Sequence, residues 1–173
     1  SQRMLLTCKV IRSNQVIHET VGLNDAVISR TSLSRLISIK LYVNEKRVAT
    51  YSCDGLIVST PAGTTAHSLS AGGPIVTPDM EAFAITPICP HTLSNRPLVV
   101  SGSSKIEMEQ ISESKGVGLT VDGQVYFDVK AGDRVVIEKA DKKLQLIDTQ
   151  TRTFYDVLRE KLNWRGQPAY DVN

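Results

Sequence analysis

The chain has 173 residues, of which 41% are hydrophobic, so it can bury one sizeable core. Neither its composition nor the distribution of its glycines and prolines shows an internal linker. Its 20 Lys and Arg against 18 Asp and Glu give a net charge of +2, spread along the sequence, which argues against a nucleic-acid partner. No apolar run approaches the roughly 20 residues of a membrane span, and no apolar signal core begins the chain, so we expect a soluble single domain over residues 1–173 with no membrane partner.

Most of the chain has the pattern of short β-strands joined by turns. Hairpins are predicted for 4–10 with 16–21, 37–43 with 47–52, and 118–121 with 124–127, across the turns Ser13-Asn14, Asn44-Glu45 and Asp122-Gly123. Further strands are predicted at 24–29, 56–59, 97–100, 105–111, 133–139 and 143–148. So many short strands indicate a mainly β fold, an antiparallel sandwich or barrel.

Two helices are predicted. The first is expected to begin at Thr64 or Thr65, whose hydroxyls can cap it, and to end before the breakers at 72–74. The second is expected over 153–162, where an apolar stripe is formed by Phe154, Val157, Leu158 and Leu162. That stripe either packs in the core or docks on a partner domain, and the sequence leaves both alternatives open.

Residues 54–76, DGLIVSTPAGTTAHSLSAGGPIV, place a short apolar strand, a tight turn and a helix start in direct succession. Free backbone N–H groups and the positive end of the helix dipole favour acceptor-rich ligands such as ribose, phosphate or carboxylate at such a point. The segment therefore predicts a ligand-binding strand–loop–helix.

Three cysteines, Cys8, Cys53 and Cys89, are odd in number, widely spaced and set among apolar residues. This pattern argues against a disulfide framework and favours a reducing, cytoplasmic setting. No Cys-x-x-Cys spacing points to zinc, so all three thiols are expected to be buried small hydrophobes. The proline in Cys89-Pro90-His91 argues against a thiol–imidazole pair, and His91 is expected to line the cleft.

The segment 54–76, together with GLNDAVISR at 22–30, ITPICPHTLSNRPLVV at 85–100, VDGQ at 121–124 and FYDVLREKLNWRG at 154–166, resembles the C-terminal domain of the NAD kinase family. The resemblance covers nearly the whole chain, and the order and spacing of its motifs are specific. It implies a β-sandwich-like domain of the NAD kinase/diacylglycerol kinase-like fold that holds NAD in a cleft. A smaller upstream α/β domain would bring the phosphoryl donor.

The resemblance also implies a reaction, which is phosphorylation of the adenosine ribose 2′-hydroxyl of NAD to give NADP. The donor would be ATP or inorganic polyphosphate, helped by a divalent metal such as Mg²⁺. The family's Gly-Gly-Asp-Gly motif, whose aspartate is thought to activate that hydroxyl, is not in these 173 residues. We therefore expect no catalytic residue and no metal ligand in this chain, and no activity from it alone. The parent protein is expected to be a homo-oligomer, a dimer or a tetramer.

The alternative is a non-catalytic NAD- or NADP-binding module that lacks a donor domain. The sequence immediately upstream of Ser1 discriminates the two, because an encoded Gly-Gly-Asp-Gly domain there favours the kinase.

The resemblance implies NAD contacts for seven residues, which are Asn24, Asp25, Asp54, Thr65, Ala66, His67 and Ser70. Asn24 and Asp25 can each hold a ribose hydroxyl, although the family usually has Asn-Glu there, and an ordinary Asx turn is the other interpretation. Asp54 would reach the nicotinamide end of a ligand bound mainly by a neighbouring subunit; otherwise it is a turn carboxylate. The VDGQ segment is first a hairpin turn and second a candidate site wall.

Thr65, Ala66 and Ser70 lie on the first turns of the expected helix, where capping and close packing are compatible with contact to the dinucleotide. At His67 the family usually has tyrosine, which stacks on the adenine ring. A neutral imidazole can still stack, with a smaller face. Ala62 removes one hydroxyl from the same loop.

Overall fold

Hairpin turns set the strand order of this protein, whose computed structural model describes residues 1–31, 36–92, 94–113, 116–147 and 151–164. The three predicted turns form, and both central residues of each have positive φ: 49° and 62° at Ser13-Asn14, 50° and 65° at Asn44-Glu45, 52° and 66° at Asp122-Gly123. This is the backbone that two-residue hairpins with the natural strand twist require.

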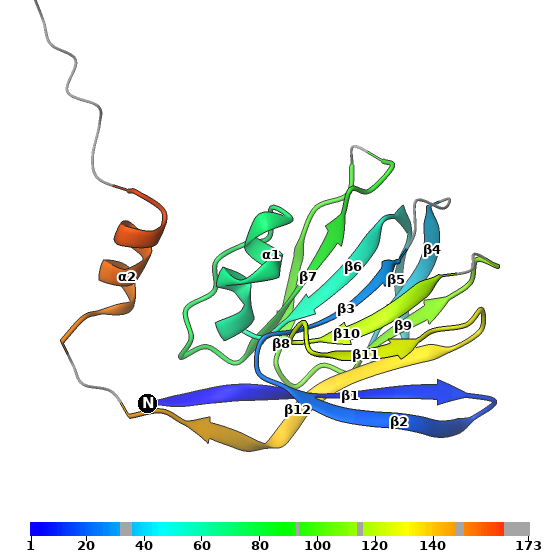
Figure 1. Ribbon diagram of the computed structural model, residues 1–173, viewed down its shortest axis with the longest axis horizontal. Coiled ribbons are helices and arrows are strands. Elements are labelled where there is room, and N and C mark those ends of the chain that lie inside the picture. The colour runs from blue at the N-terminus through cyan, green and yellow to red at the C-terminus, as the bar shows by residue number, and fades with distance from the viewer. Residues whose placement is uncertain (32–35, 93, 114–115, 148–150, 165–173) are drawn as a thin grey trace, which may run out of the picture.

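The strands form two six-stranded antiparallel sheets that pack face to face (Figure 1). The first sheet has the order β2-β1-β12-β9-β4-β5 and consists of β1 (Gln2–Arg12), β2 (Gln15–Gly22), β4 (Ile37–Val43), β5 (Lys46–Cys53), β9 (Ile106–Gln110) and β12 (Arg134–Gln145). The second sheet has the order β11-β10-β3-β6-β7-β8 and consists of β3 (Asp25–Arg30), β6 (Gly55–Ser59), β7 (Ala82–Ile88), β8 (Leu98–Ser101), β10 (Val117–Val121) and β11 (Val125–Asp128). The predicted antiparallel sandwich is confirmed.

The core lies between the sheets because alternate strand residues point inward. The first sheet contributes Met4, Leu6, Cys8, Val10, Ile37, Ile39 and Leu41, and the second contributes Ile28, Leu56, Val58, Phe83 and Ile85. Burial raises the pKa of the Cys8 and Cys53 thiols to about 12, as expected for structural cysteines. The expectation was wrong for Cys89, which is exposed because it follows the end of β7 in a turn with φ 44°.

Two strand predictions differ from the structure. Residues 133–139 and 143–148 were expected to form separate strands, but β12 runs unbroken from Arg134 to Gln145 and pairs with β1 along its length, with a register shift between Met4 and Leu6. Residues 140–142, between the two expected strands, lie at this register shift, and the pairs Leu6–Lys139 and Met4–Lys143 on either side keep the strand in the sheet. β7 was not predicted, because its buried residues do not alternate and Pro87 interrupts the pattern.

The helix expected from Thr64 is two short pieces, the 3-10 helix η1 (Ala62–Thr65) and α1 (His67–Ser70). Neither has a side-chain cap, so the predicted capping is wrong. Instead the hydroxyls of Thr64 and Thr65 donate backwards, to the carbonyls of Pro61 at 2.7 Å and Ala62 at 3.3 Å. In Figure 1, α1 lies beside the β6–β7 part of the second sheet.

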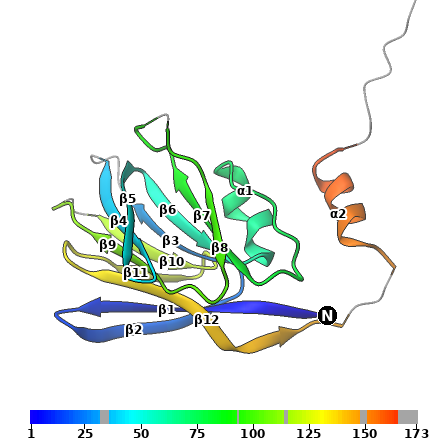
Figure 2. The same cartoon turned by 180° about the vertical axis from the view of Figure 1, so that it is seen from behind.

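The C-terminal helix α2 (Phe154–Lys161) forms as predicted, with a capping box in which the Thr153 hydroxyl accepts from the Asp156 N–H and the Asp156 carboxylate accepts from the Thr153 N–H. It stands apart from the two sheets in both ribbon views (Figures 1 and 2). Leu158 is buried, whereas Tyr155 and Trp164 are 64% and 56% exposed. Within the described residues, no helix is long and apolar enough to cross a membrane.

Candidate functional site

Strand register gathers the site at one end of the second sheet. Asp25, the first residue of β3, pairs with Ser59, the last residue of β6, and Ala26 pairs with Val121 at the end of β10. The turn before β3, the hairpin turn after β10 and the loop after β6 therefore meet. A pocket of about 190 Å³ lies there, lined by Asn24, Asp25, Ala66, His67, Thr120, Asp122 and Gly123.

The Asp122 carboxylate organises the turn before β3. Its Oδ2 accepts the N–H of Leu23 at 2.7 Å, and its Oδ1 accepts those of Asn24 at 2.7 Å and Asp25 at 3.1 Å. The Asp122 N–H in turn donates to the Asp25 carbonyl at 3.0 Å. Three converging N–H groups on one carboxylate are charge-assisted bonds, which are stronger than neutral ones.

The loop after β6 is tied to the same turn. The Thr60 N–H donates to the Asn24 carbonyl at 2.9 Å, and the Thr60 hydroxyl donates to the Leu23 carbonyl. Gly63 lies directly against this backbone, since a Cβ at position 63 would be 1.9 Å from the Asn24 oxygen. Only glycine permits this approach, which explains the glycine in the Pro61-Ala62-Gly63 turn.

Buried hydroxyls hold the short helices in place. The Val76 N–H donates to the Thr64 hydroxyl at 3.1 Å, and the hydroxyls of Ser68 and Thr86 are 3.0 Å apart. The Thr64 and Ser68 side chains are buried in these hydrogen bonds, whereas Ala66 and His67 are exposed at the rim of the pocket.

Electrostatics distinguish Asp25 from its neighbours. Its side chain is 4% exposed, and burial is the main cause that raises its pKa above the usual value. The nearby Asp122 carboxylate raises this pKa further, whereas His67 acts in the opposite direction. Asp25 therefore holds a proton to higher pH than a surface aspartate.

The structure brings four of the seven predicted residues together, which are Asn24, Asp25, Ala66 and His67. Thr65 and Ser70 do not line this pocket. Asp54 lies at the other end of β6, where it forms an ion pair with Arg30 at 2.8 Å. The register separates it from Asp25 by four to five residues along the strands, about 13–16 Å at roughly 3.3 Å per residue.

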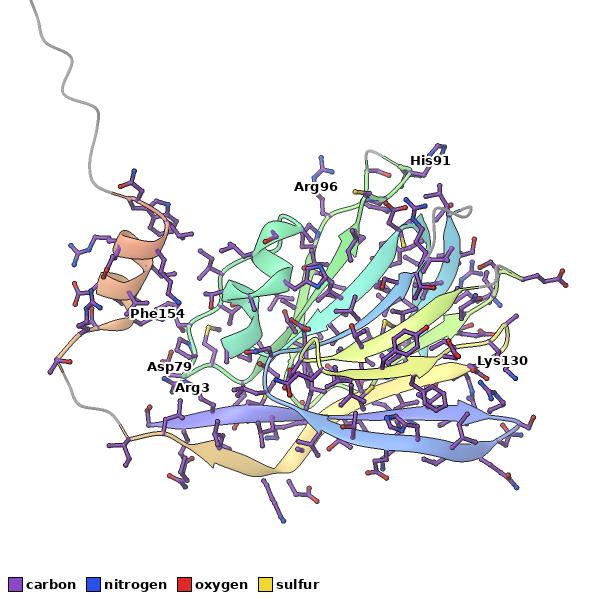
Figure 3. All side chains as sticks on the ribbon, viewed as in Figure 1. Arg3, Asp79, His91, Arg96, Lys130 and Phe154 are labelled. Atoms are coloured by element: carbon purple, nitrogen blue, oxygen red, sulfur yellow. The ribbon has the colours of Figure 1, made fainter. Side chains whose placement is uncertain are left out.

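His91 does not line this pocket either, and its place in the cleft stays a prediction. Its N–H donates to the Ser52 carbonyl at the Asp54 end of the sheet, and Figure 3 shows it on the loop beyond β7. Thr120, by contrast, was missed by sequence reasoning. The signal for it was present in the alternation of β10, which turns Thr120 to the face opposite the buried Leu119 and Val121.

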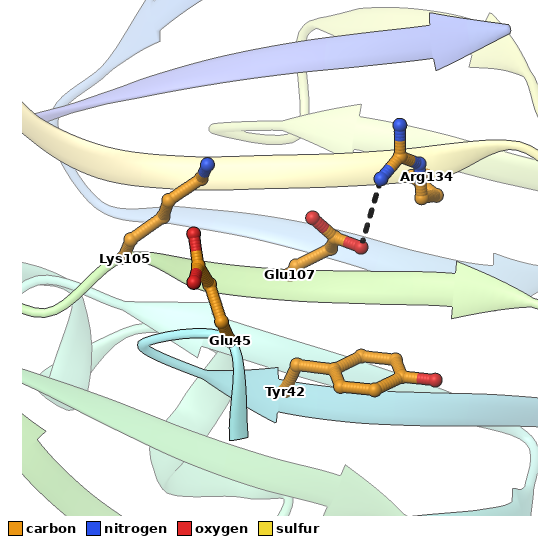
Figure 4. Close-up of a pocket in the computed structure, with 5 residues that line it drawn as sticks. All are labelled: Tyr42, Glu45, Lys105, Glu107 and Arg134. Carbon is orange, nitrogen blue, oxygen red and sulfur yellow. Dashed lines mark hydrogen bonds and ion pairs between the residues drawn. The ribbon is translucent and has the colours of Figure 1, made fainter. Parts of the chain in front are cut away.

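A larger pocket of about 330 Å³ lies on the outer face of the first sheet (Figure 4). Its lining residues are Tyr42, Glu45, Lys105, Glu107 and Arg134, and the last two form a 3.5 Å ion pair. It contains none of the predicted site residues. Its mixed charges are those of a solvated sheet face.

A metal site in a protein needs a set of ligand side chains that lie close together. Within the described residues, no group of three or more His, Cys, Asp or Glu side chains could hold a metal ion. The described residues that line the pocket therefore do not form a divalent-metal site.

The fold and the pocket define a β-sandwich domain that offers a ligand site at a strand–loop–helix junction. Residues 23–149 match the family model described as the ATP-NAD kinase C-terminal domain. The chain is 48% identical over 166 residues to the NAD kinase of Desulforamulus reducens, and 43% identical over 164 residues to that of Geobacter metallireducens. Each match covers 95% of this chain and 58% of the relative. The chain belongs to the NAD kinase family and corresponds to its C-terminal domain.

Solved structures agree with this assignment. The yeast NADH kinase in complex with NADH superposes with a TM-score of 0.90 at 28% identity, over 100% of this chain and 50% of that one. The NAD kinase from Archaeoglobus fulgidus in complex with ATP gives 0.78 at 28% identity, over 96% and 61%. The chain thus spans a little over half the length of the curated relatives it matches.

Proposed function

We propose that this chain is the NAD-binding domain of an NAD kinase that phosphorylates the adenosine ribose 2′-hydroxyl of NAD to give NADP. The observation that carries the proposal is the pocket at the Asn24-Asp25 turn, in a chain that belongs to this family. The relatives are named NAD kinases, and one neighbour was solved with NADH bound. A non-catalytic NAD- or NADP-binding module is the less favoured alternative.

The pocket residues then have separate roles. The Asn24 amide and the Asp25 carboxylate hold ribose hydroxyls, because both groups accept hydrogen bonds from an O–H donor. His67 stacks on the adenine ring from the rim, next to Ala66. Thr65 and Ser70 belong to the same two short helices and contact the dinucleotide outside the small pocket.

A second copy of the chain completes the site. Asp54 lies too far from Asp25 to share one pocket with it, which supports contact between Asp54 and a ligand held by a neighbouring subunit. Four open sheet edges, β2, β5, β8 and β11, also favour assembly into a homo-oligomer.

A donor domain supplies the rest of the reaction. It brings ATP or polyphosphate, the divalent metal and the carboxylate that activates the hydroxyl, none of which this chain's pocket supplies. The exposed side chains of Ile147, Tyr155 and Trp164 give the C-terminal segment an apolar surface on which such a domain can dock. We place the parent protein in the cytoplasm.

Titration of NAD into the chain, followed by backbone amide NMR, tests the proposal. We expect shift changes concentrated at Asn24, Asp25, Ala66, His67 and 120–123. The larger pocket of Figure 4 is an internal control, whose residues should not respond. Changes confined to that pocket, or no changes at millimolar NAD, would overturn the assignment.

A further inference from the structure

Leu23 and Asn24 form a bend between β2, which ends at Gly22, and β3, which begins at Asp25, so the bend itself has no ladder hydrogen bonds to hold it. Its position depends on contacts from elsewhere in the chain. Asp122 supplies them. It lies 97 to 99 positions away along the chain, and its carboxylate accepts three consecutive backbone N–H groups. The acceptor is itself fixed, because it sits in a tight hairpin turn and its own N–H donates to the Asp25 carbonyl.

We propose that Asp122 is a positioning residue for the dinucleotide site: by holding the backbone of Leu23, Asn24 and Asp25, it sets where their side chains meet the ribose. The inference rests on the proposed function and adds a residue to it. Asp122 lines the same pocket as Asn24 and Asp25, so its removal would alter the wall of the site as well as the turn.

Charge makes the carboxylate hard to replace. A neutral asparagine keeps the size of the side chain but has one acceptor oxygen in place of two, and its NH₂ group would face a backbone N–H. At least one of the three hydrogen bonds is therefore lost in Asp122→Asn. The same carboxylate also contributes to the raised pKa of Asp25, so the substitution removes one of the groups that favour the protonated form of Asp25.

The other side of the turn leaves little freedom to compensate. The Asn24 carbonyl accepts the Thr60 N–H and lies against Gly63, where a Cβ would approach it to 1.9 Å. A turn released by Asp122 cannot move toward the Thr60 loop. It can only move into the pocket or away from the sheet, and either movement displaces the Asn24 and Asp25 side chains.

The test compares NAD with its 2′-deoxyadenosine analogue by calorimetric titration of the chain. In the unaltered chain, NAD should bind more tightly than the analogue. In Asp122→Asn, the dissociation constant for NAD should rise by about 10-fold, the usual scale for charge-assisted hydrogen bonds, while that for the analogue changes less. The preference for the ribose hydroxyl should therefore shrink. A general loss of structure would instead weaken the binding of both ligands by the same factor.

Asp128→Asn is the matched control, because it changes an exposed aspartate of the same hairpin that bonds to the Tyr126 hydroxyl at 2.7 Å and does not line this pocket. It should leave both affinities unchanged. Amide hydrogen exchange at residues 23–25 is the second readout and should accelerate only in Asp122→Asn. Unchanged discrimination or unchanged exchange in Asp122→Asn overturns the inference alone. No NAD binding by the unaltered chain overturns the proposed function, and with it the ligand part of this inference.

Discussion

Replacement of His67 by tyrosine tests how the rim of the pocket holds adenine. His67 is exposed and lines the pocket beside Asp25. Its backbone carbonyl accepts the Ala71 N–H, a bond that the substitution keeps. The larger side chain can therefore extend over the pocket opening without displacing a packed neighbour. His67→Tyr should change the melting temperature little.

The magnitude follows from ring stacking. A phenol ring offers a larger face to adenine than an imidazole, and an aromatic pair contributes about 0.5–1.5 kcal/mol, which corresponds to roughly 2- to 13-fold in affinity. His67→Tyr should tighten NAD binding within that range, and His67→Ala should weaken it. Removing the imidazole also removes a group that lowers the pKa of Asp25, so this pKa should rise further in both variants.

Calorimetric titration of NAD into the three proteins, run beside thermal melts, measures the effect. Val16→Tyr is a suitable control, because it adds the same phenol at an exposed position on β2, in the first sheet. Unchanged affinity in both His67 variants, with normal melts, would mean that the loop at 60–67 is structural and that adenine binds elsewhere.

Three further predictions concern stability and assembly. Gln110 is fully buried, and both polar atoms of its amide lack a hydrogen-bond partner within the described residues. Gln110→Met should therefore raise the free energy of unfolding, measured by urea titration, by about 1–3 kcal/mol. The control Gln145→Met, at an exposed position, should not raise it. A loss of stability would mean that the amide is hydrogen-bonded in solution. Burial raises the Asp133 pKa, but hydrogen bonds from Arg12 at 2.7 and 2.8 Å and from the Lys130 N–H outweigh it and leave the pKa below its usual value. The stability that a lowered carboxyl pKa provides is present above the unfolded-state value of about 3.9 and is lost as pH falls through the folded value. The Arg12 side chain that would lose its partner is one-third exposed, so Asp133→Asn should cost about 1.5–3 kcal/mol at pH 7, the scale of hydrogen bonds to a charged group, and less at pH 3. An equal loss at both pH values would contradict this explanation. Sedimentation at tens of micromolar should detect a homo-oligomer, and a monomer would count against the role proposed for Asp54.

Local sequence chemistry was enough to predict the hairpins. Asn44-Glu45 and Asp122-Gly123 lie between strand-like runs, and a two-residue turn fixes the pairing of its own strands. β7 and the continuous β12 were harder to predict from the sequence, because both strands are held by pairing with strands that are distant along the chain. β7 is buried on both faces and so does not alternate, whereas the charged part of β12 stays in the sheet through its pairing with β1.

The candidate site divides in the same way. Residues 60–67 could be identified because they are contiguous and punctuated by Pro61 and Gly63. The backbone bonds from the turn at Asn24 to Asp122 span 98 residues, and no local pattern predicts them. The family resemblance named both segments without giving the bonds between them. The role of Asp54 depends on a second copy of the chain and stays a prediction.

We propose that this chain holds NAD while another domain carries the phosphoryl-transfer machinery. The most direct measurement combines a titration of NAD with a sensitive assay for NADP formation, both on rigorously purified chain with ATP and Mg²⁺ present. We predict weak, saturable NAD binding and no NADP formation, because no segment of this chain supplies a phosphate cradle for the donor. Turnover comparable to that of a full-length relative, or no binding of NAD at millimolar concentration, would contradict this division of roles between the two domains.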